Sequence, residues 1–233
     1  MDHIGPILYE LSGRDDRRFS PFCWKSRMAL AHKGFFPPGI PVTFTDKDSI
    51  AFSGQERVPI LIDNGVVITD SWMIACHLED FYSDRPTLFG GAMGRSLAGL
   101  IDTWATRSAF PLLVRLVLCD VIDHLDKADA EYVQASRERQ MSTTFVSMRQ
   151  DRDQWLRPFR DSLTPARSHL KRQGFLSGNT PGYADYCLFG FFQWARMISP
   201  YPIIEDTDPV SLWRSRMLEL FDGYAAKSPA HAD

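Results

Sequence analysis

The feature that most constrains the fold is an alternation of strand-like and helix-like segments, which ends after about ninety residues. Residues 7–11 are an apolar run typical of a first strand, and residues 20–33 have the pattern of a helix. A short second strand is predicted at residues 41–45, after the turn-forming Pro37-Pro38-Gly39. Two apolar runs then flank Asn64-Gly65, which is a strong hairpin signal. This order predicts a small sheet covered by helices.

A helix follows the hairpin, and the strand signals then stop. Asp70-Ser71 is a capping sequence, and the apolar residues after it recur at helical spacing: Ile74, Ala75, Leu78, Phe81 and Tyr82. Residues 86–91 are typical of a linker. A long helical pattern runs from Ser96 to about Leu125, and Pro111 within it predicts a kink or a break into two helices. Its apolar side chains available for burial are Leu97, Leu100, Ile101, Trp104, Phe110, Leu113, Val114 and Val117.

The remainder of the chain has only helical signals. Residues 128–160 are charged and mixed, and some helix is predicted there, limited by Pro158. Thr164-Pro165 predicts another helix start, and further helices are predicted at residues 183–197 and 211–226. The predicted fold class is therefore a mixed α/β domain joined to an all-helical domain. We place the first domain at residues 1–86, a linker at 87–94 and the helical domain at 95–233.

Composition excludes several classes of function. The net charge of −3 gives no reason to expect a nucleic-acid partner, and no apolar stretch is long enough to span a membrane. The four cysteines are Cys23, Cys76, Cys119 and Cys187, and their wide spacing matches no metal site. They suggest free thiols in a reducing compartment, and the N-terminus lacks a signal-peptide pattern. We therefore expect a cytoplasmic location and no metal.

Ser20 lies at the start of the first predicted helix, immediately before Pro21. Serine is a preferred N-cap and proline is favoured at the first helical position, so a simple cap is the plainest interpretation. The functional interpretation uses the helix start as an anion site, where the Ser20 hydroxyl donates to a bound thiolate. Lowering the pKa of a thiol by ~2 units requires about 2.7 kcal/mol of preferential thiolate stabilisation. One charge-assisted hydrogen bond at a helix N-terminus is of that order.

Two further pairs of residues also allow a structural and a functional interpretation. Val58-Pro59 is either an ordinary strand start or, with a cis peptide bond, a place where the Val58 backbone pairs with a bound peptide. Asp70-Ser71 is either a helix cap or a site for a carboxylate at a helix start, with Asp70 pairing with an ammonium group. Each signal is weak alone, and their combination in this order is strong.

This combination resembles the glutathione transferase family, which has a thioredoxin-like N-terminal domain and an all-α C-terminal domain. The resemblance rests on Ser20-Pro21-Phe22-Cys23-Trp24-Lys25, Glu56-Arg57-Val58-Pro59-Ile60-Leu61 and Thr69-Asp70-Ser71-Trp72. It continues into the C-terminal half, where residues 182–186 resemble the family's folding motif. There Gly182 replaces the usual capping side chain, so only the Asp185 half of the capping box is present. Within the family, the motifs are most similar to bacterial β-aryl etherases and their fungal etherase-like relatives.

The resemblance implies a set of roles around glutathione, which would be a co-substrate. Ser20 would be the activating hydroxyl, and Val58, with Pro59 in a cis-proline turn, would pair with the cysteinyl moiety. Asp70 and Ser71 would clamp the γ-glutamyl end, and Arg57 is a candidate contact for the glycyl carboxylate. The resemblance also implies a homodimer, with the long kinked helix at the interface. In the etherases, the glutathione thiolate displaces an aryloxide from a β-aryl ether.

An apolar electrophile is expected between the two domains, above the glutathione sulfur. The chain has 16 Phe, 7 Tyr and 6 Trp, which permits a flat aromatic ligand without proving one. For any single one of these rings, ordinary core is the favoured interpretation. The candidate pocket residues are Phe22, Trp24, Trp104, Phe110, Leu113 and Trp194.

Three functions follow from these residues. The first is a glutathione transferase acting on aromatic compounds, in detoxification or in β-aryl ether cleavage. The second is a glutathione-dependent carrier of aromatic compounds without turnover. The third is a thiol oxidoreductase, which is disfavoured because Ser20 occupies the place of the nucleophilic cysteine, while Cys23 lies inside the helix.

Overall fold

The N-terminal half is built on a mixed β-sheet. The computed structural model describes residues 5–231, and within them the strands form one four-stranded sheet in the order β2-β1-β3-β4. The strands are β1 (Ile7–Leu11), β2 (Gly39–Val42), β3 (Ile60–Asp63) and β4 (Val66–Thr69). Strand β1 is parallel to β2 and antiparallel to β3, and β3 and β4 form a hairpin. This is the thioredoxin-like arrangement expected from the resemblance.

The sheet's hairpin and first strand agree with the sequence predictions, whereas the second strand is displaced. Asn64 and Gly65 form the turn between β3 and β4 with φ of 49° and 80°, the left-handed conformation that these residue types tolerate. Strand β2 was predicted at residues 41–45 and is observed at Gly39–Val42. Phe44 and Thr45 are unavailable to the sheet because their backbone N–H groups donate to Asp129.

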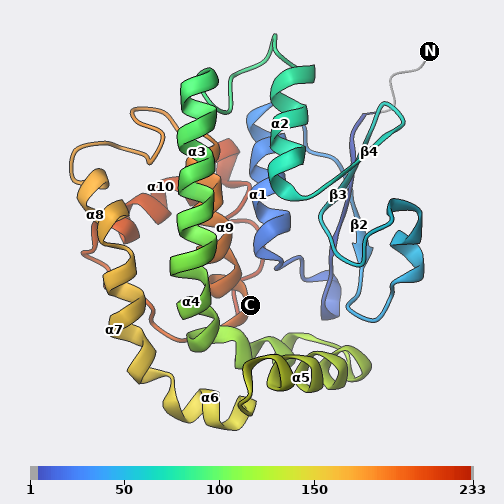
Figure 1. The fold of residues 1–233 in the computed structure, drawn as a ribbon, viewed down its shortest axis with the longest axis vertical. Coiled ribbons are helices and arrows are strands. Elements are labelled where there is room, and N and C mark those ends of the chain that lie inside the picture. The colour runs from blue at the N-terminus through green and yellow to red at the C-terminus, as the bar shows by residue number, and fades with distance from the viewer. Residues whose placement is uncertain (1–4, 232–233) are drawn as a thin grey trace.

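Two helices begin at the predicted caps and pack on the sheet. Helix α1 (Pro21–His32) begins after Ser20, whose side chain accepts a hydrogen bond from the backbone of Cys23. Helix α2 (Ser71–Phe81) begins after Asp70, and its buried side chains join the same core as α1 and the sheet. Short 3-10 turns, η1 (Arg14–Asp16) and η2 (Asp48–Ser53), complete this half (Figure 1).

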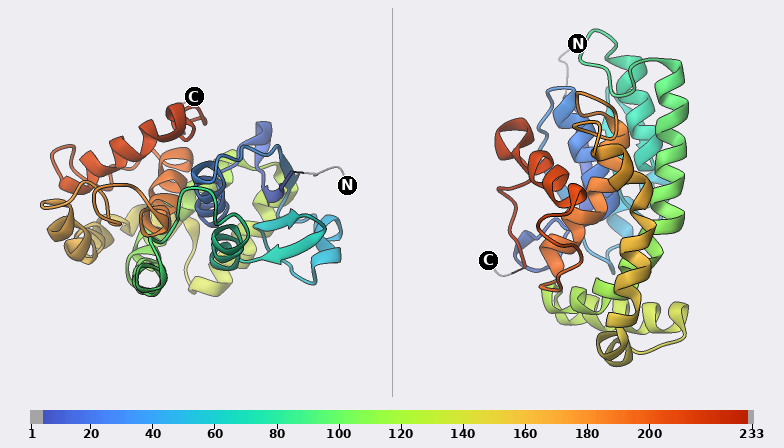
Figure 2. Two further views of the ribbon diagram at one scale, coloured as in Figure 1. Left: turned by 90° about the horizontal axis from the view of Figure 1, so that it is seen from above. Right: turned by 90° about the vertical axis from the view of Figure 1, so that its left-hand side faces the viewer.

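The helical half begins with a long rod. Helix α3 (Ala92–Trp104) starts inside the predicted 87–94 linker and passes through a π-helical turn (Ala105–Ala109) into α4 (Phe110–Val117). Figure 2 shows that α3 and α4 continue one another. The predicted disturbance at Pro111 therefore takes the form of a π turn directly before it. The 3-10 segment η4 (Leu118–His124) follows. The domain boundaries themselves stay predictions.

Six more helices complete the described chain: α5 (Lys127–Met141), α6 (Phe145–Asp151), α7 (Asp153–Ser162), α8 (Thr164–Leu170), α9 (Tyr183–Ile198) and α10 (Pro209–Gly223). One expectation was wrong here, because Pro158 lies inside α7 and does not limit it. The helix start predicted at Thr164-Pro165 is confirmed, since α8 begins at Thr164, although the Thr164 hydroxyl donates to the carbonyl of Asp161 and does not cap the helix. No helix between residues 5 and 231 is both long and apolar enough to cross a membrane.

Helix α9 is buried along almost its whole length and joins the two halves. It packs against α1 so closely that a Cβ atom on Gly190 would lie 2.3 Å from the carbonyl oxygen of Pro21. Only glycine fits at this contact. The start of α9 is fixed by Asp185, which accepts from the backbone of Gly182 at 3.1 Å, as the resemblance implied. Asp185 also accepts from Trp213 Nε1 at 2.8 Å, so it holds α10 as well.

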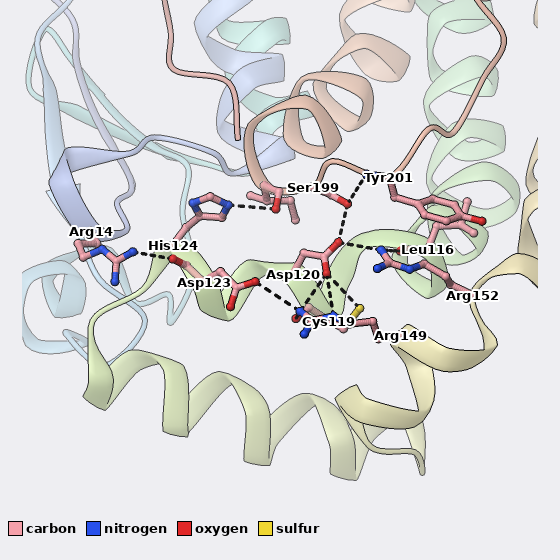
Figure 3. Close-up of polar contacts among 11 residues, drawn as sticks. Arg14, Leu116, Cys119, Asp120, Asp123, His124, Arg149, Arg152, Ser199 and Tyr201 are labelled. Atoms are coloured by element: carbon pink, nitrogen blue, oxygen red, sulfur yellow. Dashed lines mark hydrogen bonds and ion pairs between the residues drawn. The ribbon is translucent and has the colours of Figure 1, made fainter. Parts of the chain in front are cut away.

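A second buried carboxylate, that of Asp120, connects several helices of the helical half. Figure 3 shows Asp120 in η4 surrounded by donors from other segments. Arg152 donates to it at 2.9 Å, Arg149 at 3.0 Å and the hydroxyl of Ser199 at 2.5 Å. Because Asp120 is almost fully buried, these donors supply the compensation that a buried charge requires. The network fixes the ends of α6, α7 and α9 relative to the long rod.

Candidate functional site

The strand register brings the three sequence signals to one edge of the sheet. Tyr9 pairs with Ile60 in the antiparallel β1–β3 ladder, so Val58 falls beside the carboxyl end of β1. Ile60 also pairs with Thr69, so Asp70 and the start of α2 lie beside Pro59. Helix α1 begins after the loop that leaves the same end of β1. Two helix N-termini and one strand start therefore meet at this edge.

Ser20 is almost buried at the start of α1. Its Oγ accepts a hydrogen bond from the backbone N–H of Cys23 at 3.3 Å, which is the expected capping contact. Among the described residues, the Ser20 hydroxyl donates to no oxygen or nitrogen atom, and the Cys23 thiol is its one side-chain partner. A capping hydroxyl can therefore still donate to a ligand in front of the helix, where the helix dipole favours negative charge.

The other two pairs, Val58-Pro59 and Asp70-Ser71, have the backbone arrangement that their functional interpretations require. The Val58–Pro59 peptide bond is cis, and Val58 is half-buried directly before β3. Asp70 has a φ of 72°, and its Oδ1 accepts from the backbone N–H groups of Trp72 at 2.8 Å and Met73 at 3.2 Å. The carboxylate is exposed, and this cap does not use its Oδ2 oxygen. Asp70 can therefore cap α2 and face a cationic ligand group at the same time.

Ser71 has a contact that the sequence did not predict. Its side chain is buried, and its carbonyl oxygen accepts a hydrogen bond of 2.8 Å from the hydroxyl of Tyr183 in α9. The helical half therefore supports the start of α2 directly. Trp72 lies in edge contact with the same tyrosine ring, at 5.7 Å between centroids. No local sequence signal links these residues, because they are more than a hundred positions apart.

Several candidate pocket residues form one aromatic cluster, which we call the aromatic wall: Phe22, Phe110, Phe191 and Trp194. Phe22 lies two residues after Ser20, and its ring is 5.6 Å from that of Phe110. Phe110 is stacked on Phe191 at 4.4 Å. The sequence did not single out Phe191. Phe22 and Phe110 are half-buried, whereas Trp194 lies mostly behind them in the core.

The other three candidate pocket residues, Trp104, Leu113 and Trp24, are not part of the aromatic wall. Trp104 is half-buried at the end of α3, and Leu113 is almost fully buried in α4. Trp24 is completely buried; its Nε1 donates to the carbonyl of Arg18 and its ring packs against Tyr224. Trp24 was proposed as a pocket residue and instead belongs to the core.

Lys25 supports the aromatic wall from behind. Its ammonium group is buried between the rings of Phe22 and Phe191, at 4.9 Å and 4.6 Å from their centroids. It also pairs with Asp102 of α3 at 2.6 Å. The cation therefore connects α1 to the helical half and holds two of the wall's rings.

The chain also has an open groove elsewhere. A groove of about 550 Å³ lies between α2 and α3 and is lined by Trp72, Glu79, Asp80, Gly91, Ala92, Arg95, Ser96 and Gly99. None of the candidate aromatic residues lines it. Its lining also lacks Ser20 and Val58, so the groove is separate from the edge at which the helix starts meet.

Cys23 is not equipped for disulfide exchange. All four cysteines are free, and Cys23 is almost fully buried. Burial, with a further contribution from the nearby charge of Glu10, raises the pKa of the Cys23 thiol to about 12. The thiol therefore stays protonated near neutral pH, which argues against the oxidoreductase interpretation, because disulfide exchange requires a thiolate. Within residues 5–231, no group of three or more His, Cys, Asp or Glu side chains could hold a metal ion.

A thioredoxin-like sheet, a hydroxyl at the start of α1 and an all-helical second half define the fold of the glutathione transferases. The family description "Glutathione S-transferase, N-terminal domain" matches residues 19–80, and "Glutathione S-transferase, C-terminal domain" matches residues 96–209. The chain belongs to the glutathione S-transferase family.

The most informative relatives are fungal. The chain is 27% identical over 164 residues to a glutathione S-transferase-like protein, ustS, of Aspergillus flavus; the match covers 64% of this chain and 54% of that protein. A glutathione S-transferase of Ceriporiopsis subvermispora, CsGST63524, crystallised in complex with glutathione, is similar with a TM-score of 0.83 and 21% identity, covering 94% of this chain and 97% of that one. The transferase GSTFuA3 of Phanerochaete chrysosporium has a TM-score of 0.76 and 23% identity, covering 97% and 95%.

Proposed function

We propose that this protein is a glutathione transferase in which Ser20 activates the glutathione thiol for attack on an apolar, aromatic electrophile. The observation that carries the proposal is the meeting of Ser20, Val58 and Asp70 at one edge of the sheet. A structural neighbour, CsGST63524, was crystallised with glutathione, which supports glutathione as the co-substrate. The family membership supports the transferase class.

In this proposal each part of the edge binds one part of the tripeptide. The Val58 backbone pairs with the cysteinyl moiety beside Pro59, which brings the sulfur to the start of α1. Asp70 and Ser71 bind the γ-glutamyl end, because its ammonium and carboxylate groups match an exposed carboxylate and a helix N-terminus. Arg57 faces the glycyl end. The binding energy thus positions the sulfur next to Ser20.

The reaction then needs only the chain's own groups and the two substrates. The glutathione thiol loses its proton to solvent, and the Ser20 hydroxyl donates a hydrogen bond to the resulting thiolate. The sulfur forms a bond to an electrophilic carbon, and the leaving group departs with the electron pair of the broken bond. For a β-aryl ether, the leaving group is an aryloxide. We propose that Phe22, Trp104 and Phe110 hold the aromatic electrophile, with Leu113 and Trp194 behind them.

The direct test is turnover by the wild-type protein with glutathione and a panel of electrophiles, including activated aryl halides and a β-aryl ether. We expect conjugation with at least one aryl halide, because the proposed site stabilises a thiolate next to an aromatic wall. Calorimetry with glutathione alone measures binding separately. Binding of glutathione and of aromatic ligands without turnover across the panel would instead favour the carrier function. Cleavage of the β-aryl ether would assign the protein to the etherase-like branch.

We also propose a homodimer formed through the exposed apolar face of α2 and α3. This dimer patch consists of Met73, Phe81, Met93, Leu97 and Leu100, with Met93 80% and Leu100 63% exposed. Leu97 and Leu100, which the sequence made available for burial, lie on the surface of this chain. Large apolar side chains clustered on one exposed face are typical of an interaction surface.

The free cysteines are consistent with a cytoplasmic location, which we propose as well.

Replacing Leu100 by glutamate should convert the dimer to a monomer, because a charge placed in an apolar interface loses its hydration without gaining a partner. Analytical ultracentrifugation measures the mass directly. Leu212→Glu is the matched control, since Leu212 is similarly exposed on α10, away from the patch. A wild-type monomer, or a dimer that persists in Leu100→Glu, would contradict the proposed interface.

A further inference from the structure

Glu10 of β1 is a carboxylate buried inside the N-terminal half. Its side chain is completely buried, and Arg27 of α1 donates to its two oxygens from Nε and Nη2, each at 2.5 Å. The carboxylate fits there because residue 39 is glycine, at which a Cβ atom would lie 1.6 Å from Glu10 Oε1. The bidentate pair with Arg27 already supplies the compensation that this buried charge requires.

A second guanidinium, that of Arg18, reaches the same carboxylate from the loop before α1. Arg18 Nη1 donates to Glu10 Oε1 at 3.1 Å, and Nη2 donates to the carbonyl of Gly39 at 3.3 Å. The Nε atom donates to Asp16 Oδ1 at 2.6 Å. Because Glu10 already has a partner in α1, the main consequence of these contacts lies in the loop itself. One side chain ties this loop to β1, β2 and η1 at once.

The earlier part of this loop has a backbone conformation that depends on such contacts. Asp15 and Asp16 have φ of 55° and 56°, in the left-handed region that residues other than glycine rarely occupy. Consecutive residues of this kind persist where the surrounding structure determines them. Asp16 is held by the hydroxyl of Ser12 at 3.0 Å and by Arg18. Removal of the Arg18 side chain therefore allows the loop to relax.

The later part of the loop transmits the position of Arg18 to Ser20. The carbonyl of Arg18 accepts a hydrogen bond of 2.7 Å from Trp24 Nε1. Phe19 is almost fully buried, and its ring lies 6.4 Å from that of Phe44. The carbonyl of Ser20 accepts from the backbone N–H of Trp24 at 3.0 Å. The main chain is thus fixed on both sides of the Ser20 side chain, with Arg18 as the polar anchor on the loop side.

We propose that Arg18 is a positioning residue, which keeps the Ser20 hydroxyl at the place where it donates to the glutathione sulfur. The inference rests on the proposed function. The Arg18 guanidinium points to Glu10 and the sheet, so its effect reaches the sulfur only through Ser20. A hydrogen bond weakens steeply as its geometry departs from the optimum. A displaced hydroxyl should stabilise the thiolate less, while Val58 and Asp70 still bind the tripeptide.

The test is a double-mutant cycle that combines Arg18→Met with Ser20→Ala. Methionine removes the guanidinium but keeps an unbranched side chain, and Glu10 keeps its pair with Arg27. Alone, Arg18→Met should lower the turnover number about three- to tenfold and raise the pKa of the bound thiol, with a nearly unchanged dissociation constant of glutathione. In the Ser20→Ala protein, the same substitution should change neither quantity, because the hydroxyl through which Arg18 acts is absent. Kinetics, calorimetry and thiolate absorbance supply these values.

Arg167→Met is the matched control for the loss of a half-buried ion pair. Arg167 of α8 donates to Asp208 from Nε at 3.0 Å and Nη2 at 2.9 Å, and to the carbonyl of Arg160 at 3.1 Å. Figure 1 shows α8 on the opposite side of the molecule from the sheet. This variant should lose stability in thermal unfolding and keep the turnover number and the thiol pKa of wild type.

Arg18→Lys keeps one donor for Glu10 and gives a milder form of the cycle if the methionine variant does not fold. It should lose less turnover than Arg18→Met, and again none in the Ser20→Ala background. Equal losses in both backgrounds, or no change of turnover and thiol pKa in the wild-type background, would overturn the assignment. A Ser20→Ala protein with wild-type turnover would instead overturn the proposed function and this inference with it, so the two failures are distinguishable.

Discussion

Replacing Ser20 by alanine should lower the turnover number by about 10- to 100-fold while leaving the dissociation constant of glutathione nearly unchanged. A hydrogen bond to a charged partner contributes about 1.5–3 kcal/mol, and each 1.36 kcal/mol of lost stabilisation is a factor of ten. The groups proposed to bind the two ends of the tripeptide are untouched, so binding should persist. The pKa of the bound thiol should rise, which moves the pH–rate profile to higher pH. Steady-state kinetics, calorimetry and the ultraviolet absorbance of the thiolate measure these effects.

The same serine caps α1, so its structural and chemical roles must be separated. Loss of the cap costs about 1 kcal/mol of stability, which thermal unfolding reports independently. Ser20→Thr keeps both the capping oxygen and the donor, and it should retain most of the activity. Unchanged turnover and an unchanged thiol pKa in Ser20→Ala would show that the hydroxyl is only a cap. Loss of glutathione binding would show that the variant had damaged the site.

Replacing Asp185 by alanine should destabilise the protein by about 3–5 kcal/mol. The fully buried carboxylate accepts from the backbone of Leu176 at 2.7 Å, Ser177 at 3.0 Å and Gly182 at 3.1 Å, and from the Trp213 indole at 2.8 Å. Its removal leaves the buried donors of Gly182 and Trp213 without a partner, each costing about 1–3 kcal/mol, and it also frees the less buried donors of Leu176 and Ser177. The costs are not additive, so the total falls below their sum. Chemical denaturation gives the free energy of unfolding.

Two further variants delimit this effect. Asp185→Asn keeps one acceptor oxygen, so its destabilisation should be intermediate. Asp151→Ala removes an exposed aspartate at the end of α6 and should be nearly neutral. An Asp185→Ala protein as stable as wild type would mean that the start of α9 does not depend on this carboxylate.

The N-terminal half could be predicted because its local signals agree with its tertiary structure. Caps at Ser20 and Asp70 and the Asn64-Gly65 turn specify their conformations through nearby backbone groups, and all three were confirmed. The region of α5 to α7 was predicted only vaguely. Helix α5 is rich in charge and has just Asp129 and Val133 buried, so its apolar periodicity is weak. Pro158 was misjudged, since α7 continues on both sides of it.

The candidate site could be predicted only where its residues cap or begin an element. The sequence predicted the starts of α1, α2 and β3, and the register then placed them together. It could not decide which face of α1 each ring occupies, since α1 is buried on nearly all sides, and Trp24 was therefore misassigned. Tyr183 was missed because its importance comes from a contact between segments far apart in the chain.

The close contact at Gly190 restricts how this fold can diversify. Because α9 touches the backbone at Pro21 with no room for even a methyl group, the two helices cannot slide past one another at this contact. A larger side chain at position 190 cannot be accommodated either. Changes in substrate specificity must therefore arise around this contact, among side chains such as Phe22, Trp104 and Phe110. The contact between α1 and α9 stays constant, while the side chains around it can change.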